Sequence, residues 1–176
     1  MKTSNSKSGP KSATSLHVIG NSSYIEVAGI QSVPAKTDTG ASYSSIWASD
    51  LRMSPSGELE FTLFAPESPL YTGERLKTRH YRAVHVRNST GQESVRYAVQ
   101  LSARISGKRI RAWFTLADRS RNDFPVLIGR RTLKHKFLVD VSRLDVPYRT
   151  NTPSRGLTRE LLTNPQKFHR QYIHKH

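Results

Sequence analysis

The run Asp38-Thr39-Gly40-Ala41 stands at the end of a strand predicted over Val33–Asp38 and leads into Ser42-Tyr43-Ser44-Ser45-Ile46. In a chain of this composition, an Asp-Thr-Gly tripeptide is expected by chance only about 0.03 times. Taken alone, the run also fits an Asx turn, in which the aspartate side chain accepts a hydrogen bond from the backbone two residues on. Asp38 is therefore a candidate catalytic residue, and a second feature of the sequence is needed to support that role.

A second apolar stretch lies about ninety residues further along the chain and ends in Ile128-Gly129. It predicts a strand over Phe124–Gly129, followed by one short helix over Arg130–His135. Continuous apolar runs are typical of strands that are covered on both faces. We therefore predict that Phe124–Gly129 and Phe137–Val141 are central strands.

The sequence between the two motifs predicts antiparallel strands, because polar and apolar residues alternate with a period of two. This alternation marks three segments: Arg82–Arg87, Val95–Ile105 and Arg109–Leu116. The joining residues 88–92 and 106–108 each contain a glycine that a tight hairpin can use. Further strands are predicted over Leu16–Ile19, Tyr24–Ile30 and Phe61–Phe64, with a turn at Gly20-Asn21 between the first two. The fold is thus mainly β, a closed barrel or a sandwich.

The absence of cysteine narrows the chemistry that the chain can perform. It excludes a disulfide scaffold, a thiol nucleophile and zinc sites with sulfur ligands, and it leaves carboxylates and seven histidines as reactive groups. No apolar run is long enough to span a membrane, and residues 1–15 lack the apolar stretch of a signal peptide. We therefore expect a cytoplasmic protein with no membrane partner.

The formal net charge of +15 is distributed unevenly along the 176 residues. Residues 1–15 are predicted to be a flexible basic tail, 16–143 one folded domain, and 144–176 a second basic tail that is partly helical over Thr158–Thr163. Within the domain, residues 75–111 contain ten basic side chains and a single acidic one, Glu93. Such a surface could bind nucleic acid or an acidic peptide, or it could simply keep exposed strands solvated. No motif for nucleic-acid recognition accompanies the charge.

Four ordered blocks of sequence resemble the retropepsin-like aspartic proteases, which implies a closed β-barrel or sandwich subunit. The resemblance is closest to a bacterial family labelled ATP-dependent zinc proteases, whose members are often linked to ribosomal-protein glutamate ligases. It covers roughly residues 16–143. Thr37 departs from the pattern, because an aliphatic residue usually precedes the aspartate. The blocks are Ala35–Ala41, Arg82–Gly91, Phe114–Ser120, and Phe124–Leu133 together with Phe137–Ser142.

Neither part of that label is supported by the residues themselves. The sequence has no phosphate-binding Gly-x-x-x-x-Gly-Lys-Ser/Thr loop and no His-Glu-x-x-His motif. His80 and His85 are too few and too loosely spaced to form a zinc site without further ligands. We therefore expect no cofactor and no metal.

The resemblance implies an aspartic peptidase, in which two carboxylates share a proton and activate a water molecule. Because the chain has one Asp-Thr-Gly, a homodimer would pair Asp38 with Asp38 of the second copy. Thr39 and Gly40 would shape the catalytic turn, whereas Asp118, Asp123 and Asp140 lie in other contexts. Substrate would contact the turn and a flap hairpin at residues 88–92. The residues implied in substrate binding are Ala41, Ser42, Arg87, Asn88, Gly91 and Arg96.

The basic arms of this hairpin predict an acidic, glutamate-rich peptide or protein as the substrate. Two other functions stay open. One is a catalytically silent retropepsin-like module that binds an acidic protein partner through the same groove. The other is a nucleic-acid-binding β-domain, whose affinity would depend steeply on salt and not on Asp38.

Overall fold

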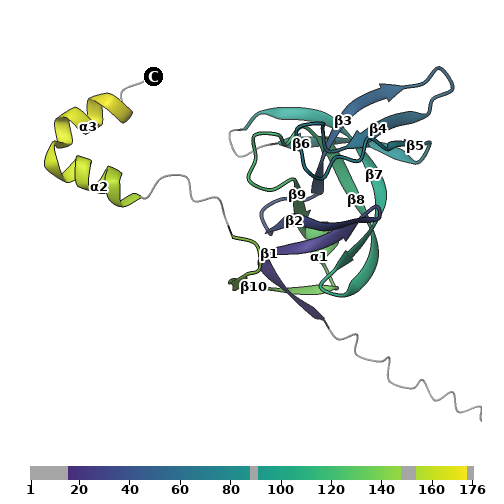
Figure 1. The fold of residues 1–176 in the computed structure, drawn as a ribbon, viewed down its shortest axis with the longest axis horizontal. Coiled ribbons are helices and arrows are strands. Elements are labelled where there is room, and N and C mark those ends of the chain that lie inside the picture. Colours follow the sequence, from purple (N-terminus) through teal and green to yellow (C-terminus); the bar gives the residue numbers. More distant parts are fainter. Residues whose placement is uncertain (1–15, 88–90, 148–153, 174–176) are drawn as a thin grey trace, which may run out of the picture.

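The structure is a computed structural model that describes residues 16–87, 91–147 and 154–173. The predicted N-terminal tail and Asn88 lie outside these ranges. Figure 1 shows the arrangement of the strands and helices. In chain order they are β1 His17–Val27, β2 Ile30–Asp38, β3 Ser44–Met53, β4 Leu59–Leu63, β5 Arg75–Thr78, β6 Tyr81–Arg87, β7 Glu93–Ile105, β8 Lys108–Ala117, β9 Val126–Gly129, α1 Arg130–Leu133, β10 Phe137–Leu144, α2 Ser154–Thr163 and α3 Pro165–Tyr172.

Six of these strands close into a barrel. Hydrogen bonds connect β1, β2, β9, β3, β8 and β7 in that order, and a short antiparallel pairing of β1 with β7 completes the ring. This seam joins Glu26 with Arg104 and Val27 with Ala103. The predicted mainly β fold with a short helix after Ile128-Gly129 is therefore confirmed, and of the two predicted forms it is the closed barrel.

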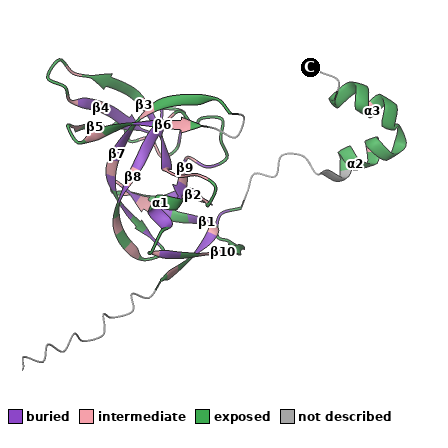
Figure 2. Cartoon of the chain, turned by 180° about the vertical axis from the view of Figure 1, so that it is seen from behind, coloured by how far each residue is buried: buried purple, intermediate pink, exposed green. Residues whose placement is uncertain are grey.

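The core of the barrel is formed by the inward-facing residues of these strands. Buried residues are coloured purple in Figure 2. Fully buried examples are Ile19, Val33, Ile46, Phe114 and Ile128. The predicted alternation holds along β8 and the second half of β7. In the first half of β7 it fails, because that part extends with β6 as a hairpin, and Val95 there is 70% exposed.

Three strand predictions need correction. β1 is one continuous strand, so the predicted turn at Gly20-Asn21 is wrong; the register shifts there instead, as in a β-bulge. Gly20 lets the backbone of β10 pass, because a Cβ at this position would lie 2.6 Å from the carbonyl oxygen of Arg143. β10 is an edge strand and not a central one, which leaves Leu138 and Val141 55% and 73% exposed. β3 and β5 were absent from the predicted strands.

The folded part continues beyond residue 143. Val146 is buried, and its carbonyl oxygen accepts a hydrogen bond of 2.6 Å from the Ser22 hydroxyl. Further on, α2 contains the predicted helical segment, and α3 was not predicted. Its start carries a recognisable cap, because the Asn164 side chain accepts a hydrogen bond from the Lys167 amide and Pro165 follows the cap. In the described ranges, the helices are all too short or too polar to cross a membrane.

Candidate active site

Asp38 is the last residue of β2, where the strand lies beside β9 and Asp38 is opposite Gly129. The preceding residue, Thr37, is buried and donates a hydrogen bond of 2.7 Å from its hydroxyl to the Gly20 carbonyl oxygen. This bond explains how a polar residue can replace the aliphatic one expected from the resemblance, because its hydroxyl is not left without a partner.

The Asp38 carboxylate is held by the turn that follows it. Its Oδ1 atom accepts hydrogen bonds of 3.0 Å from the backbone N–H groups of Gly40 and Ala41. The Asx turn considered from the sequence is therefore present. The turn occupies only one of the two carboxylate oxygens, because no hydrogen bond joins Oδ2 to another described residue and Asp38 is only half-buried. One oxygen is thus fixed, and the other is available to a ligand.

The turn after Asp38 rests on the start of α1. The amides of Arg130 and Arg131 donate to the carbonyl oxygens of Ala41 and Ser42, at 2.9 and 3.2 Å. The guanidinium of Arg130 also donates to the Ser42 hydroxyl at 2.7 Å. Ala41 and Ser42, both implied in substrate binding, are therefore held in place by backbone and side-chain bonds, whereas Thr39 and Gly40 are exposed.

Gly129 forms the back of this turn. Its amide donates to the Ser44 hydroxyl at 3.1 Å, and that hydroxyl is 2.7 Å from the Thr132 hydroxyl. A Cβ on Gly129 would lie 2.4 Å from the carbonyl group of Tyr43. Real Cβ atoms essentially never come this close, so only glycine allows β9 to pass so near the turn.

Arg119 is the site residue that sequence reasoning missed. It lines a cavity of about 230 Å³ together with Asp38, and it is only 9% exposed. Its Nε atom donates to the Phe124 carbonyl oxygen at 2.9 Å. The pKa of Arg119 is lowered to about 10, chiefly by burial and also by the positive charge of Arg96, while the negative charge of Asp38 opposes the shift. The sequence did contain a signal for this residue. Arg119 is a basic residue two positions after the largely buried end of β8, within the block Phe114–Ser120 that carries the resemblance.

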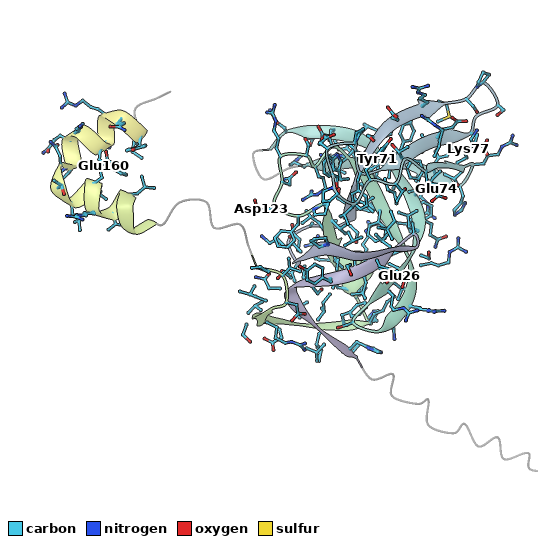
Figure 3. All side chains as sticks on the ribbon, viewed as in Figure 1. Glu26, Tyr71, Glu74, Lys77, Asp123 and Glu160 are labelled. Atoms are coloured by element: carbon cyan, nitrogen blue, oxygen red, sulfur yellow. The ribbon has the colours of Figure 1, made fainter. Side chains whose placement is uncertain are left out.

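Asp123 lies on the wall of the same cavity as Asp38, on the segment between β8 and β9 (Figure 3). Asp118 and Asp140 are engaged locally, because each accepts a hydrogen bond from the amide of the serine two residues on. The pKa of Asp118 is lowered chiefly by the bond from the Ser120 amide, and that of Asp140 chiefly by the bond from the Ser142 hydroxyl and then by that from its amide. Of the three other aspartates considered, Asp123 alone shares the cavity with Asp38.

The predicted hairpin is present, with Arg87 of β6 opposite Glu93 of β7. Arg87 also forms an ion pair with Glu93, and its Nε atom donates to that carboxylate at 2.7 Å. Arg96 is half-buried, and its Nε atom donates to the Ser94 hydroxyl at 3.3 Å. Arg96 is close enough to Arg119 for its positive charge to help lower the pKa of that residue, although Arg96 does not line the Asp38 cavity. Gly91, at the hairpin, is exposed and has a φ of +83°.

The donor groups do not suit the zinc of the family label. Across residues 16–87, 91–147 and 154–173, no three histidine or carboxylate side chains gather where they could hold a metal ion. His80 contacts the ring of Trp113, with 5.2 Å between ring centroids, and His85 pairs with Glu93 at 3.3 Å.

Comparisons with known proteins identify the fold and the family of the chain. A protein of unknown function from Legionella pneumophila has a solved structure that matches 78% of this chain and 100% of its own, with a TM-score of 0.57 and 20% identity. This likeness concerns the fold alone. Two proteins named "Probable alpha-L-glutamate ligase" are also similar. The one from Shewanella pealeana is 26% identical over 117 residues, and the one from Desulfotalea psychrophila is 27% identical over 116.

These matches cover 65% and 64% of this chain but only 26% and 25% of the two ligases, so the chain spans about a quarter of the length of these relatives. Residues 18–150 match a family described as "RimB-like: Retropepsin-like aspartic endopeptidase RimB". That range contains the Asp38 turn, the flap hairpin, Arg119 and the Gly129 crossing. The chain belongs to the RimB-like family of retropepsin-like aspartic endopeptidases.

Proposed function

We propose that the chain is an aspartic peptidase in which Asp38 and the Asp38 of a second copy together activate a water molecule. The observation that carries this proposal is the Asp38 carboxylate itself, with Oδ1 fixed by two backbone amides and Oδ2 without a partner among the described residues. A fixed and accessible carboxylate is what a general base requires. Arg119 lines the same cavity and adds a positive charge there.

The pair of carboxylates would share one proton between them. The ionised carboxylate takes a proton from water as the water oxygen bonds to the peptide carbon, and the protonated carboxylate gives its proton to the carbonyl oxygen. The resulting tetrahedral diol then breaks its C–N bond. The carboxyl group that took the water proton delivers it to the departing nitrogen, while the other carboxylate takes a proton from a hydroxyl of the diol. This leaves an acid and an amine and restores the proton that the two carboxylates share.

Two features support a second copy of the chain. Thr39 and Gly40 are exposed, so a second turn can approach the first. The edge strand β10, which pairs only with β1 among the described strands, also presents apolar side chains to solvent, and this suits pairing with another chain. Its exposed apolar residues are Leu138, Val141 and Leu144.

An acidic peptide is the proposed substrate. Arg119 and Arg96 bring positive charge to the Asp38 cavity, whereas the charge of Arg87 is met by Glu93. The names of the two similar ligases refer to α-L-glutamate, which supports glutamate as the recognised side chain.

A cytoplasmic location is part of the same proposal, and fractionation of cells that express the tagged chain would test it.

Peptide cleavage is expected to depend on the square of protein concentration when most of the chain is monomeric, because each active unit needs two copies of Asp38. The measurement is the initial rate of cleavage of a Glu-rich peptide and of a Gln-rich control over a series of dilutions and salt concentrations. Salt should slow only the Glu-rich reaction, because it screens exposed charges. A rate that is linear down to the lowest concentration would contradict the shared site, and equal rates for both peptides would contradict the acidic substrate.

A catalytically silent module that binds an acidic partner is the second candidate. The observation that favours it is the Asx turn, because local structure alone accounts for an aspartate at position 38. Binding of the Glu-rich peptide without cleavage at any concentration would support this alternative over the peptidase.

Replacement of Arg119 by methionine is expected to lower kcat/KM at least about tenfold while the melting temperature changes little. Activity should fall because Asp38 loses its neighbouring cation. Stability should change little, because removing a costly buried charge offsets the lost hydrogen bond to Phe124. Arg121→Met is the matched control on the same segment, since Arg121 is exposed and does not line the cavity. Equal activities for the two variants would remove Arg119 from the site.

A further inference from the structure

A second cavity, of about 250 Å³, is lined by residues of β6, β7, β8 and α1, together with Tyr43 and Lys136. Its apolar lining includes the buried side chains of Val84, Ala98 and Ala112. Four cationic side chains also line it, and none of its lining residues is acidic. The four are Arg82, Arg111, Arg131 and Lys136, and we call the cavity that they line the cationic pocket.

Aromatic rings hold two of these guanidinium groups in place. The Cζ atom of Arg82 lies 3.9 Å from the centroid of the Trp113 ring, and that of Arg131 lies 4.3 Å from the Tyr43 ring. A guanidinium stacked on a ring keeps its plane fixed, while its N–H groups at the edge can still donate to an anion. Such a fork fits a carboxylate with two parallel hydrogen bonds and loses little side-chain entropy on binding.

The cationic pocket gathers four basic side chains around one cavity with no carboxylate to meet them. Carboxylates do meet some basic side chains elsewhere in the described part of the chain: Arg75 and Lys77 with Glu60, Arg87 with Glu93, and Arg104 with Glu26. No such ion pair is formed by the four residues of the cationic pocket within residues 16–87, 91–147 and 154–173. Like charges around one cavity repel, so the site is electrostatically incomplete without an anion.

The pocket also adjoins the elements of the proposed active site. Tyr43 belongs to the turn that follows Asp38, and Arg131 is bonded to that turn through the Ser42 carbonyl oxygen. On the other side, Arg82 and Val84 belong to β6, which is an arm of the flap hairpin. A peptide that lies between the turn and the flap can therefore extend toward the pocket.

We propose that the cationic pocket is an exosite that binds carboxylate side chains of an acidic peptide outside the catalytic cleft. The identity of this occupant rests on the proposed function, whereas the pocket itself does not. Single-stranded nucleic acid is disfavoured, because its bases bind by stacking on open aromatic faces. Here Arg82 covers a face of Trp113, and Arg131 covers a face of Tyr43.

The test measures binding separately from cleavage. A Glu-rich peptide is titrated into the Asp38→Asn protein, and the dissociation constant is obtained by calorimetry alongside Trp113 fluorescence. The Arg82→Gln/Arg131→Gln variant should bind at least about tenfold more weakly, because two charge-assisted forks are lost. Lys108→Gln/Arg109→Gln removes the same charge from the start of β8, outside the pocket, and should weaken binding less than about threefold.

Equal losses in the two double variants, or no binding of the Glu-rich peptide, would overturn the exosite. So would tighter binding of an oligonucleotide of equal charge with the same dependence on Arg82 and Arg131, because the pocket would then be a phosphate site. If peptide binds in the pocket but the unmodified protein cleaves nothing, the exosite stands and the peptidase proposal fails. If cleavage occurs, Arg82→Gln/Arg131→Gln should raise KM and leave kcat nearly unchanged.

Discussion

Asp38→Asn is expected to lower peptide cleavage at least about a thousandfold, because an amide can neither accept a proton from water nor share one with the second carboxylate. The fold should be retained. The asparagine oxygen can accept the same two hydrogen bonds from Gly40 and Ala41, so the turn keeps its geometry. The measurement is kcat/KM for a Glu-rich peptide together with the melting temperature of the variant.

Asp140→Asn is the matched control for this substitution. Asp140 makes a comparable local turn, since its Oδ1 atom accepts hydrogen bonds from the amide and hydroxyl of Ser142, but it lies outside the Asp38 cavity. Its activity should equal that of the unmodified protein. Activity of Asp38→Asn within tenfold of the unmodified protein would rule out the proposed mechanism.

Mixing the unmodified protein with an excess of Asp38→Asn adds a test of subunit sharing. If the dyad spans two copies, a ninefold excess of the variant, at a concentration where the chain is dimeric, should reduce the activity per unmodified chain to roughly a tenth, because about nine in ten unmodified chains then pair with the variant. An unchanged activity per chain would mean that each copy acts alone, and Asp123 on the same cavity wall would become the candidate partner for Asp38.

Gly129→Ala is expected to destabilise the barrel by about 3 kcal/mol or more, because the new Cβ would overlap backbone atoms and not a side chain that can rotate away. The atoms concerned are the carbonyl carbon and oxygen of Tyr43, at 2.4 Å, and the amide nitrogen of Ser44, at 2.9 Å. For a chain of this size the melting temperature should fall by roughly 10 °C. Chemical denaturation followed by circular dichroism measures the loss.

Gly156→Ala provides the comparison for this glycine. Gly156 lies in α2, has no atom near the position of an added Cβ, and has a backbone conformation that other residues adopt readily. Alanine there should leave barrel stability unchanged, and it should strengthen α2 by about 0.5–1 kcal/mol. Similar stabilities for the two alanine variants would show that the β9 crossing tolerates a side chain.

The sequence was sufficient to predict the barrel and the Asp38 turn. Alternation along β8 predicts a sheet with one buried face because residues such as Ala112 and Phe114 must all point the same way. β3 was not predicted from the sequence, because two of its buried residues are serines and do not contribute to an apolar pattern. Their hydroxyls are buried with partners that are distant in sequence: Ser44 meets Thr132, and Ser45 donates to the Thr115 carbonyl oxygen.

Long-range pairing also limited what could be predicted about charge. The excess of basic residues between 75 and 111 looked nearly unopposed, because the acids that meet Arg75 and Arg104 come from β4 and β1. Arg119 was missed for the same reason, since only the fold brings it beside Asp38. Sequence spacing indicates which residues share a strand face, but not which side chains from different strands meet.

The order of the strands around the barrel has a consequence for how the chain folds. β1 pairs with β10, where His17 meets Phe137, and β2 pairs with β9, where Ala35 meets Val126. A nascent chain that has emerged only as far as Ala117 therefore already carries the Asp38 turn and the flap but has nothing with which to close the ring. Because such non-local pairings form slowly, barrel closure must wait until nearly the whole domain has left the ribosome.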